Sequence, residues 1–337
     1  MRPWLVTGAA GFIGSHVARR LAALEQPVVG IDNLNDYYDP ALKRARLEDL
    51  ATLAQFTFEQ VDCTHGEPLA DVFRRYEPVK VIHLAAQAGV RHSLSHPMDY
   101  IDANVVGFMR ILEECRRAGV DHLVYASSSS VYGHTAQLPF SVHTPADHPV
   151  SIYAATKRAN ELMAHAFSHL HGLPATGLRF FTVYGPWGRP DMAYYKFARA
   201  IILGETLSIY GDGSALRDFT YVDDIVEGLV RVAADPAVAD PEWDRQSPDP
   251  ARSRAPWRLF NIGHGEQVTV NAMIDLLEDI IGRPARRLHV AAEPGDVPVT
   301  HADTEDLQRE FGFTPTTGLR DGLERFVHWM RTHAIGQ

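Results

Sequence analysis

Residues 3–14 read Pro3-Trp4-Leu5-Val6-Thr7-Gly8-Ala9-Ala10-Gly11-Phe12-Ile13-Gly14. The apolar run before Thr7 predicts a short buried strand, and the pattern after Gly14 is helical as far as Leu24. Glycines between a strand and a helix allow a tight turn, in which backbone N–H groups approach a pyrophosphate at the helix N-terminus. The spacing Gly-x-x-Gly-x-x-Gly differs from the commonest dinucleotide fingerprint, so the turn alone is also compatible with plain strand–helix punctuation.

A second predicted strand supports a dinucleotide site. Val28-Val29-Gly30-Ile31 reads as a buried strand that ends in Asp32. In dinucleotide-binding folds an acidic residue stands about 20 residues after the glycine turn, as Asp32 does here. A carboxylate there can accept hydrogen bonds from both ribose hydroxyls and repels a 2′-phosphate, so it favours NAD over NADP. Asp32 has a plainer alternative as a helix N-cap or loop acid, but the order strand–turn–helix–strand favours cofactor binding.

A second motif lies in the run Ser151-Ile152-Tyr153-Ala154-Ala155-Thr156-Lys157. Positions four apart share one face of a helix, so the side chains of Tyr153 and Lys157 can reach one cavity. A neighbouring ammonium favours the phenolate, so Lys157 is expected to lower the pKa of Tyr153 toward neutral pH. Such a phenol is a general acid/base suited to hydroxyl–carbonyl chemistry. Tyr and Lys can also stand four apart by coincidence, so the pair alone is suggestive.

Composition sets the class of protein. A chain of 337 residues predicts one large domain or two intimate ones. The net charge of −10 argues against a nucleic acid or an anionic membrane as partner. We find no signal peptide and no apolar run of the roughly 20 residues that a membrane span needs. The two cysteines, Cys63 and Cys115, fit a reducing compartment without a disulfide framework, so a cytoplasmic protein is expected.

Strands and helices are predicted to alternate along the first half of the chain, which indicates a parallel sheet with right-handed crossovers. Strands are expected near 3–7, 27–32, 56–61, 79–85, 121–127 and 175–181, with long helices that include 97–118 and 151–170. Shorter elements follow: helices near 193–203, 223–234, 268–281, 303–311 and 319–333, and strands near 207–210, 219–222 and 258–262. Residues 235–256 hold five prolines and many charges and read as an exposed or partly disordered loop.

The motifs, taken in order, resemble the extended short-chain dehydrogenase/reductase family along nearly the whole chain. The matching elements are Thr7–Gly14, Asp62-Cys63 after the third strand, His83-Leu84-Ala85-Ala86-Gln87 at the fourth, Asn104 in a long helix, Ser127–Ser130 after the fifth strand, and Tyr153 with Lys157. The resemblance implies an α/β fold: a Rossmann-like doubly wound parallel sheet with a smaller C-terminal α/β substrate domain.

The resemblance also implies a division into domains. The NAD-binding Rossmann domain is expected at 1–182, with return segments near 219–235 and 258–263. The nucleotide-sugar-binding domain is expected at 183–218 and 264–337, and residues 236–257 form the exposed Pro-rich loop. Members of the family often dimerise through the helices near 97–118 and 151–170, so a homodimer is expected.

The resemblance assigns roles to individual residues. Tyr153, Lys157 and Ser128 are expected to be catalytic, because Ser128 matches the catalytic position of nucleotide-sugar 4-epimerases. The residues expected to bind NAD are Gly8, Gly11, Phe12, Ile13, Gly14, Asp32, Asn33, Asp62, Cys63, Leu84, Ala85, Ala86, Gln87, Asn104, Tyr153 and Lys157. The residues expected to bind a UDP-sugar are Arg91, Ser128, Ser129, Ser130, Thr182, Arg189, Tyr210, Arg217 and Asp296.

Three of these assignments have plainer alternatives. Ser127–Ser130 is also compatible with a simple polar turn. Arg217 resembles the family arginine that meets the diphosphate, a task suited to a planar guanidinium, and its alternative is a surface ion pair. Arg189, in the loop Gly185–Ala193, is expected either to hold a substrate carboxylate or to brace an interdomain hinge by an ion pair. The Asp-Glu pair that serves water elimination in dehydratases of the family does not occur after Ser127, so dehydration is disfavoured.

The choice of sugar comes from the resemblance alone. Residues 32–44, 87–93 and 294–304 are similar to UDP-glucuronate 4-epimerases, and Thr182 stands where many UDP-glucose 4-epimerases carry Asn. Asp296 lies in a turn that resembles the uridine-ribose contact, although Glu293 stands where Arg is often found. The implied reaction is reversible C4 epimerisation of UDP-glucuronate to UDP-galacturonate through a 4-keto intermediate, with transient hydride transfer to tightly bound NAD. The alternatives are a UDP-glucose 4-epimerase, a UDP-glucuronate decarboxylase and a catalytically silent NAD sensor.

No metal is expected. His165, His169 and His171 lie close together, but no Glu completes a His-Glu-x-x-His pattern and no Cys pair supports zinc. A solvated helix face explains these histidines better.

Overall fold

The computed structural model describes residues 1–135, 137–291 and 297–334. Its centre is a seven-stranded sheet in the order β11-β6-β5-β4-β1-β2-β3, in which every neighbouring pair is parallel. The strands are β1 (Trp4–Thr7), β2 (Val28–Asp32), β3 (Phe56–Gln60), β4 (Lys80–His83), β5 (His122–Ser128), β6 (Ala175–Phe180) and β11 (Trp257–Ile262). The chain runs outward from β1 to β3 and then returns to β4 on the other side of β1. The predicted doubly wound sheet is therefore confirmed, and ligands in such sheets bind at the carboxyl ends beside this reversal.

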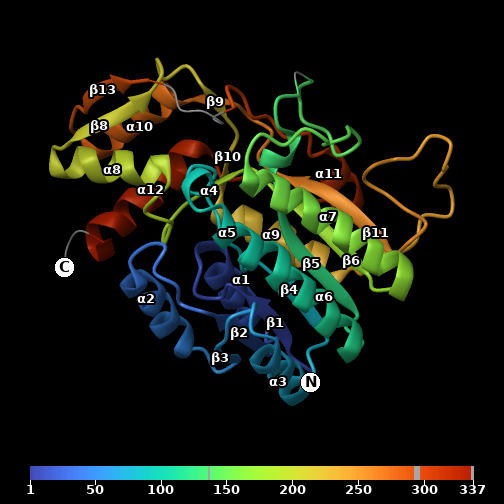
Figure 1. The fold of residues 1–337 in the computed structure, drawn as a ribbon. Coiled ribbons are helices and arrows are strands. Elements are labelled where there is room, and N and C mark those ends of the chain that lie inside the picture. The colour runs from blue at the N-terminus through green and yellow to red at the C-terminus, as the bar shows by residue number, and fades with distance from the viewer. Residues whose placement is uncertain (136, 292–296, 335–337) are drawn as a thin grey trace.

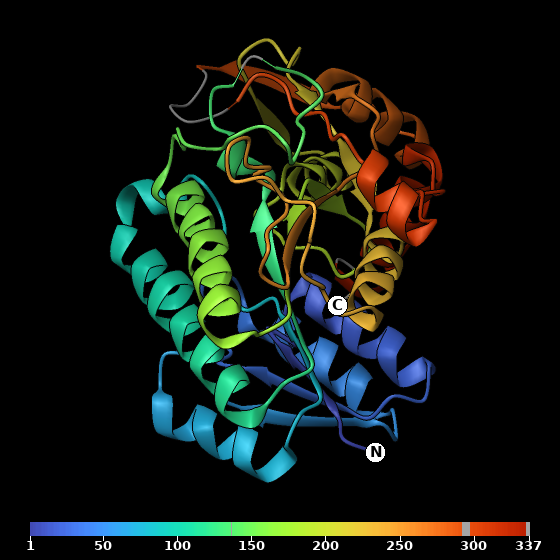
Figure 2. The ribbon, with the colours of Figure 1, turned by 90° about the vertical axis from the view of Figure 1, so that its right-hand side faces the viewer.

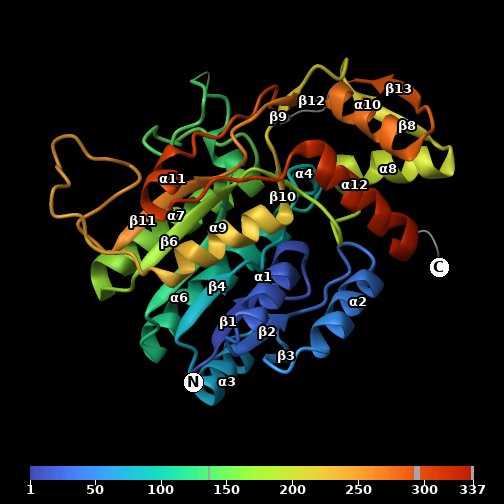
Figure 3. The same ribbon diagram turned by 180° about the vertical axis from the view of Figure 1, so that it is seen from behind.

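Helices cover both faces of the sheet. Figure 1 shows the face with α3 (Gly66–Tyr76), α6 (Gly107–Ala118) and α7 (Ile152–His171), and Figure 3 the face with α1 (Phe12–Ala23), α2 (Pro40–Ala51) and α9 (Val222–Ala234). Figure 2, turned by 90°, shows the two helical layers with the sheet between them. The apolar positions of α6 explain its placement, since Phe108, Ile111, Leu112 and Cys115 recur at helical spacing and are all buried.

The long helix expected at 97–118 is divided into segments. The short helices α4 (His92–Ser95) and α5 (Pro97–Tyr100) are followed by a π-helix, η1 (Ile101–Val106), which continues into α6. Such π segments are rare and often accompany functional sites. Here the π-helix carries Asn104, whose side chain is buried against the loop that follows β4.

A smaller group of elements lies above the carboxyl ends of the strands (Figure 1). The strand β8 (Thr206–Tyr210) pairs in parallel with β13 (Arg286–Val290), beside α8 (Ala193–Leu203), α10 (Val270–Ile281) and α12 (Leu319–Trp329), which continues into η3 (Met330–Ala334). Two small ladders join this group to the sheet, one of β7 (Thr182–Tyr184) with β10 (Phe219–Tyr221) and one of β9 (Leu216–Arg217) with β12 (Val268–Thr269). The remaining elements are η2 (Ser129–Tyr132) and α11 (Glu305–Phe311).

The loop between α9 and β11, which was expected to be exposed, is exposed only in part. It lacks helix and strand, as expected, and projects from the molecule in Figure 1. Its ends are packed rather than exposed, because Ala237, Ala251 and Ala255 are buried. A hydrogen bond from Asp240 N to Ser253 O (2.9 Å) ties the two sides of the loop together.

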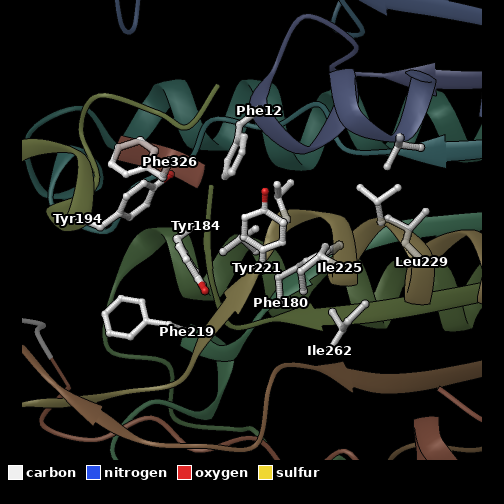
Figure 4. Close-up of a cluster of buried hydrophobic side chains, with 14 of the residues drawn as sticks. Phe12, Phe180, Tyr184, Tyr194, Phe219, Tyr221, Ile225, Leu229, Ile262 and Phe326 are labelled. Atoms are coloured by element: carbon white, nitrogen blue, oxygen red, sulfur yellow. The ribbon is translucent and has the colours of Figure 1, made fainter. Parts of the chain in front are cut away.

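One apolar core connects the sheet with the smaller group. Figure 4 shows Phe12 of α1, Tyr184 of β7, Tyr221 of β10 and Phe326 of α12 in the same cluster of buried side chains. The rings of Tyr184 and Tyr221 have centroids 5.7 Å apart. The two parts of the chain are therefore packed against each other by a continuous aromatic core rather than joined by a flexible linker.

A buried ion pair anchors α7 to the sheet. Both carboxylate oxygens of Glu161 accept hydrogen bonds from Arg179 of β6, at 2.8 and 2.9 Å. The same carboxylate accepts from the Ser127 hydroxyl of β5 (2.6 Å) and from Arg158 (2.8 Å). The side chains of Glu161 and Arg179 are fully buried. Glu161 therefore links α7 to two neighbouring strands.

We predict that Glu161→Gln lowers the free energy of unfolding by about 3–5 kcal/mol, because it leaves a buried guanidinium without its counter-charge. Burial alone would raise the pKa of Glu161, but the charge and hydrogen bonds of Arg179 lower it. A carboxylate with a lowered pKa stabilises the fold above its unfolded-state pKa, and this contribution is lost as the pH falls through the folded-state pKa. The difference between variant and wild type should therefore shrink on acidification.

Denaturant unfolding at several pH values measures this effect. The control is Asp279→Asn, which breaks an exposed ion pair with Arg320 and should change stability by less than about 1 kcal/mol. A Glu161→Gln protein as stable as this control would contradict the anchoring role of the pair.

Candidate active site

A cavity of about 440 Å³ opens at the carboxyl ends of the central strands. Of the residues predicted to bind the cofactor, Asn104 alone does not line it. Of the residues predicted to bind the sugar nucleotide, Ser128, Ser129, Ser130, Thr182 and Arg189 line it. The structure therefore brings together residues from segments as distant in the sequence as Gly8 and Arg189.

The glycine turn between β1 and α1 has the geometry of a phosphate cradle. Gly8 has φ +71°, and a Cβ atom there would lie 2.8 Å from the backbone nitrogen of Ala85. A Cβ atom at Gly14 would overlap the carbonyl oxygen of Gly8. No side chain caps the N-terminus of α1, so its N–H groups and positive dipole end are available to an anion. These features fit the pyrophosphate of a dinucleotide.

Two carboxylates line the cavity, one at the end of β2 and one just after β3. Asp32 is buried and accepts hydrogen bonds from Ala10 N (3.2 Å) and Leu34 N (2.9 Å), so it also fixes the shape of the glycine turn. Burial would raise the pKa of Asp62, but hydrogen bonds from Asn33 and Thr64 lower it. Both acids therefore have lone pairs held in place for hydroxyl donors such as those of a ribose.

Lys43 is a cavity residue that sequence reasoning missed. Its ammonium donates to the carbonyl (2.8 Å) and side-chain (2.7 Å) oxygens of Asn35. Burial lowers the pKa of Lys43, and the charge of Asp32 opposes this effect. Lys43, Arg46 and Leu50 stand at helical spacing and are the buried residues of α2, but two of the three are charged, so no apolar period in the sequence marks this face.

The catalytic candidates meet where β5 ends beside α7. Ser151 caps the helix by accepting from Ala154 N (3.1 Å), which places Tyr153 in the first turn and Lys157 one turn later. The Lys157 ammonium donates to the carbonyl oxygen of Ala126 (2.8 Å). The Ser128 hydroxyl accepts from Ser130 N (3.1 Å) and forms a hydrogen bond with Tyr153.

The expected effect of Lys157 on Tyr153 is wrong for this structure. Burial raises the pKa of Tyr153, and the opposing influences are the hydrogen bond from Ser128 and the charge of Arg189. Burial also lowers the pKa of Lys157 to about 8. The ammonium is turned toward a main-chain carbonyl of β5, and the cation that lowers the pKa of the phenol is Arg189, from the loop after β7.

Arg189 lies in the loop after β7. Its guanidinium forms a two-point ion pair with Asp191, at 3.0 and 2.6 Å, and the Tyr37 hydroxyl donates to the same carboxylate (3.3 Å). The partner of Arg189 thus belongs to its own loop, whereas an interdomain brace would place the partner across the hinge. Within the described residues, the Nη1 group of Arg189 donates no hydrogen bond.

Asn104 supports the wall of the cavity from behind. Its side-chain amide accepts from Gln87 N (2.8 Å) and donates to Gln87 O (3.0 Å) and to Thr156 Oγ1 (3.0 Å). These bonds use most of the hydrogen-bonding capacity of the amide. Asn104 therefore holds the main chain of a cavity residue and does not itself reach the cavity.

Three residues predicted to bind the sugar nucleotide are placed differently. The guanidinium of Arg91 lies 3.8 Å from the ring centroid of Tyr210, which joins the segment after β4 to β8. Arg217 donates to Leu216 O (2.9 Å) and Pro298 O (3.2 Å). These side chains do not line the cavity, while Asp296 and Glu293 lie outside the described residues.

The described residues contain neither a metal-binding cluster nor a membrane-spanning helix. No group of three His, Cys, Asp or Glu side chains there is arranged to hold a metal ion. His165, predicted to lie on a solvated face, contacts Ser253 and the ring of Trp257. No described helix is both long and apolar enough to cross a membrane.

Comparisons with known proteins agree with this geometry. The model of the NAD dependent epimerase/dehydratase family matches residues 4–244. Protein CapI of Staphylococcus aureus is 49% identical over 325 residues, which cover 96% of this chain and 97% of that protein. UDP-glucuronate 4-epimerase 1 of Arabidopsis thaliana is 45% identical over 330 residues, which cover 96% of this chain and 76% of that protein.

A solved structure matches along almost the whole length of both chains. The crystal structure of UDP-glucuronic acid 4-epimerase from Bacillus cereus, in complex with UDP-glucuronic acid and NAD, has a TM-score of 0.87 and 32% sequence identity. The match covers 98% of this chain and 99% of that one. The family model, the relatives and the fold agree, and this chain belongs to the NAD dependent epimerase/dehydratase family.

Proposed function

We propose that this protein is an NAD-dependent UDP-glucuronate 4-epimerase that interconverts UDP-glucuronate and UDP-galacturonate. The observation that carries the proposal is one cavity lined by Tyr153, Ser128 and Arg189 together with the glycine turn that leads into the uncapped N-terminus of α1. The similarity to the Bacillus cereus epimerase bound to UDP-glucuronic acid and NAD supports the choice of substrate and cofactor.

In the proposed mechanism, bound NAD supplies the hydride acceptor and donor for C4 of the sugar. Tyr153 removes the proton of the C4 hydroxyl and later returns a proton to the oxygen on the other face. Ser128, hydrogen-bonded to that phenol, orients the proton transfer. Lys157, fixed by Ala126 O, would hold the nicotinamide ribose with its remaining N–H groups. Arg189 stabilises the phenolate through its charge.

The roles of the cofactor residues follow from their places along the cavity, and those of the residues outside it follow from the resemblance to the family. The glycine turn and the acids Asp32 and Asp62 are assigned to the NAD diphosphate and ribose, and Lys43 extends this set. Arg217 is assigned to the substrate diphosphate, Arg91 and Tyr210 to the nucleotide, and Asp296 to the uridine ribose. Anchoring the nucleotide while the sugar is free to turn is what lets the 4-keto sugar present both faces to one hydride site.

The carboxylate of the substrate creates a hazard. Oxidation at C4 gives a β-keto acid, which loses CO₂ when the C5–C6 bond aligns with the ketone π system. We assign the restraint that prevents this alignment to Arg189, with hydroxyls from Thr182, Ser129 and Ser130. All four line the cavity, and the Nη1 group of Arg189 has no partner within the described residues.

A homodimer in the cytoplasm completes the proposal. Met98, Leu162 and Leu170 are exposed large apolar side chains on α5 and α7, the helices through which members of the family often dimerise. Analytical ultracentrifugation of the wild type and of Leu162→Glu measures this, because a charge within the interface should shift the variant toward the monomer.

NMR of the purified protein with each sugar nucleotide tests the reaction itself. Conversion of UDP-glucuronate to UDP-galacturonate, without conversion of UDP-glucose, is the expected result. Turnover of UDP-glucose alone would replace the proposal with a UDP-glucose 4-epimerase. Release of CO₂ with a pentose product would identify a decarboxylase, and no reaction with either sugar would favour an NAD sensor.

Tyr153→Phe is predicted to lower kcat by at least the 10²–10⁴-fold typical of a general acid/base, while bound NAD is retained. The ring still packs, but the proton acceptor is gone. Tyr76→Phe is the matched control, since the hydroxyl of Tyr76, at the end of α3, donates a hydrogen bond to Glu59 of β3, away from the cavity. More than half of the wild-type kcat in Tyr153→Phe would remove the phenol from the mechanism.

Asp32→Ala is predicted to weaken NAD binding and to relax discrimination against NADP, because a carboxylate that repels a 2′-phosphate is removed. Calorimetric titration of both cofactors measures the ratio of their dissociation constants. Asp36→Ala, at an exposed acid four residues further on, serves as the control. An unchanged ratio would leave Asp32 with only its structural role in the glycine turn.

Arg189→Ala is predicted to slow epimerisation of UDP-glucuronate much more than any residual reaction of uncharged UDP-glucose. A pentose by-product, visible by NMR, is expected to appear because the carboxylate is no longer restrained. Arg199→Ala is the control, because it breaks only an exposed ion pair between Arg199 of α8 and Glu205. Equal losses on both sugars without a by-product would point to a hinge role instead.

A further inference from the structure

Arg46 is buried where a surface helix would ordinarily place a solvated charge. It lies on α2, where Arg44 and Glu48 are both exposed, yet only 1% of the surface of Arg46 is exposed. Within the described residues, no carboxylate forms an ion pair with it. A buried guanidinium without an ionic partner is costly unless its donors are hydrogen-bonded, so the partners of Arg46 define its role.

The guanidinium of Arg46 connects three separate segments. Nη1 donates to Ala10 O of the glycine turn (2.9 Å) and to the Tyr38 hydroxyl (2.7 Å). Nη2 donates to Trp187 O (2.6 Å) and, at 3.5 Å, to Gly188 O. One side chain thus joins the turn assigned to the NAD diphosphate to the main chain just before Arg189. The planar fork of arginine allows this, because its donors point to opposite sides in fixed directions.

The loop before Arg189 needs such an anchor. Trp187 has φ +60°, a left-handed backbone conformation that costs a non-glycine residue about 1 kcal/mol or more. A second cavity, of about 220 Å³, lies between α1, α2 and this loop and is lined by Pro186, Trp187 and Arg46. Close packing therefore does not support the loop from this side, and hydrogen bonds to its carbonyl oxygens do.

We propose that Arg46 is a positioning residue that fixes the Arg189 loop to the cofactor turn and thereby sets the preference of the enzyme for a sugar with a carboxylate. Arg46 does not line the main cavity, so it acts through the loop and not on the substrate. The inference about preference rests on the proposed function, whereas the anchoring of the loop does not.

The primary variants are Arg46→Met and Arg46→Lys. The first removes all donors, and the second keeps the charge but cannot donate to Ala10 O and Trp187 O at the same time. Arg44→Met is the matched control on the same helix. Arg46→Met should raise the dissociation constant of UDP-glucuronate roughly 10- to 100-fold, as displacement of a binding group by about 1 Å does, and that of UDP-glucose much less. Arg46→Lys should fall between Arg46→Met and the wild type, and Arg44→Met should match the wild type.

A double-mutant cycle separates positioning from general loss of stability. If Arg46 acts through Arg189, the variant Arg46→Met/Arg189→Met should bind UDP-glucuronate no more weakly than Arg189→Met alone. Additive losses, or equal losses for both sugars in Arg46→Met, would overturn the role in preference. If Arg46→Met does not fold, the same cycle is run with Arg46→Lys.

Hydrogen exchange without ligands tests the anchor independently of activity. Amides of residues 185–192 should exchange faster in Arg46→Met and Arg46→Lys than in the wild type, and should be unchanged in Arg44→Met. Unchanged exchange in this segment would overturn the anchor. A wild type that binds no UDP-glucuronate would refute the proposed function, and faster exchange in the loop would still support the anchor.

Discussion

The buried ion pair of Glu161 and Arg179 determines where the reactive side chains lie. Tyr153, Lys157 and Glu161 follow one another at intervals of four along α7, so they share one face of the helix. Because Glu161 is bound to β6 and to Ser127 of β5, this face is turned toward the end of the sheet, where Ser128 follows directly. Burying such a pair brings little net stability. Its effect here is to fix the rotation of a 20-residue helix against the strand that carries its hydrogen-bond partner.

Apart from Arg189, the cations in and behind the site are held by neutral partners. The chain has a net charge of −10, so attraction of an anionic sugar nucleotide must be local. Lys157 donates to Ala126 O, Lys43 to Asn35, and Arg46 to main-chain carbonyls and one phenol. Neutral acceptors orient these groups without cancelling their charge, which is the arrangement expected of a preorganised electrostatic site.

The sequence predicts the central sheet and most of the cavity because those features follow from local patterns. A glycine turn after a buried strand, and a Tyr–Lys pair on one helix face, need no distant partner to be recognised. The strand Arg286–Val290 was not predicted, because its side chains are largely exposed and it is a strand only through pairing with β8. The burial of Arg46 was also not predicted. A buried helix face is recognised by apolar residues at helical spacing, and the inner face of α2 carries charged residues instead. Burial raises the pKa of Tyr153, and one of the two groups that oppose this effect is Arg189, which is 36 residues away in the sequence and near only in the fold.

The pairing of Arg189 with Asp191 fits what an epimerase requires of its restraint. On the proposed mechanism the 4-keto sugar must turn over between two hydride transfers, so its carboxylate must be released and recaptured. A buried arginine without a counter-ion would bind a carboxylate strongly and slow this turn. Asp191 holds two donors of the guanidinium, and the hydroxyl of Tyr37 in turn holds Asp191. The substrate then competes for a cation that is already half neutralised, and the position of that cation is kept by its loop whether or not the carboxylate is bound.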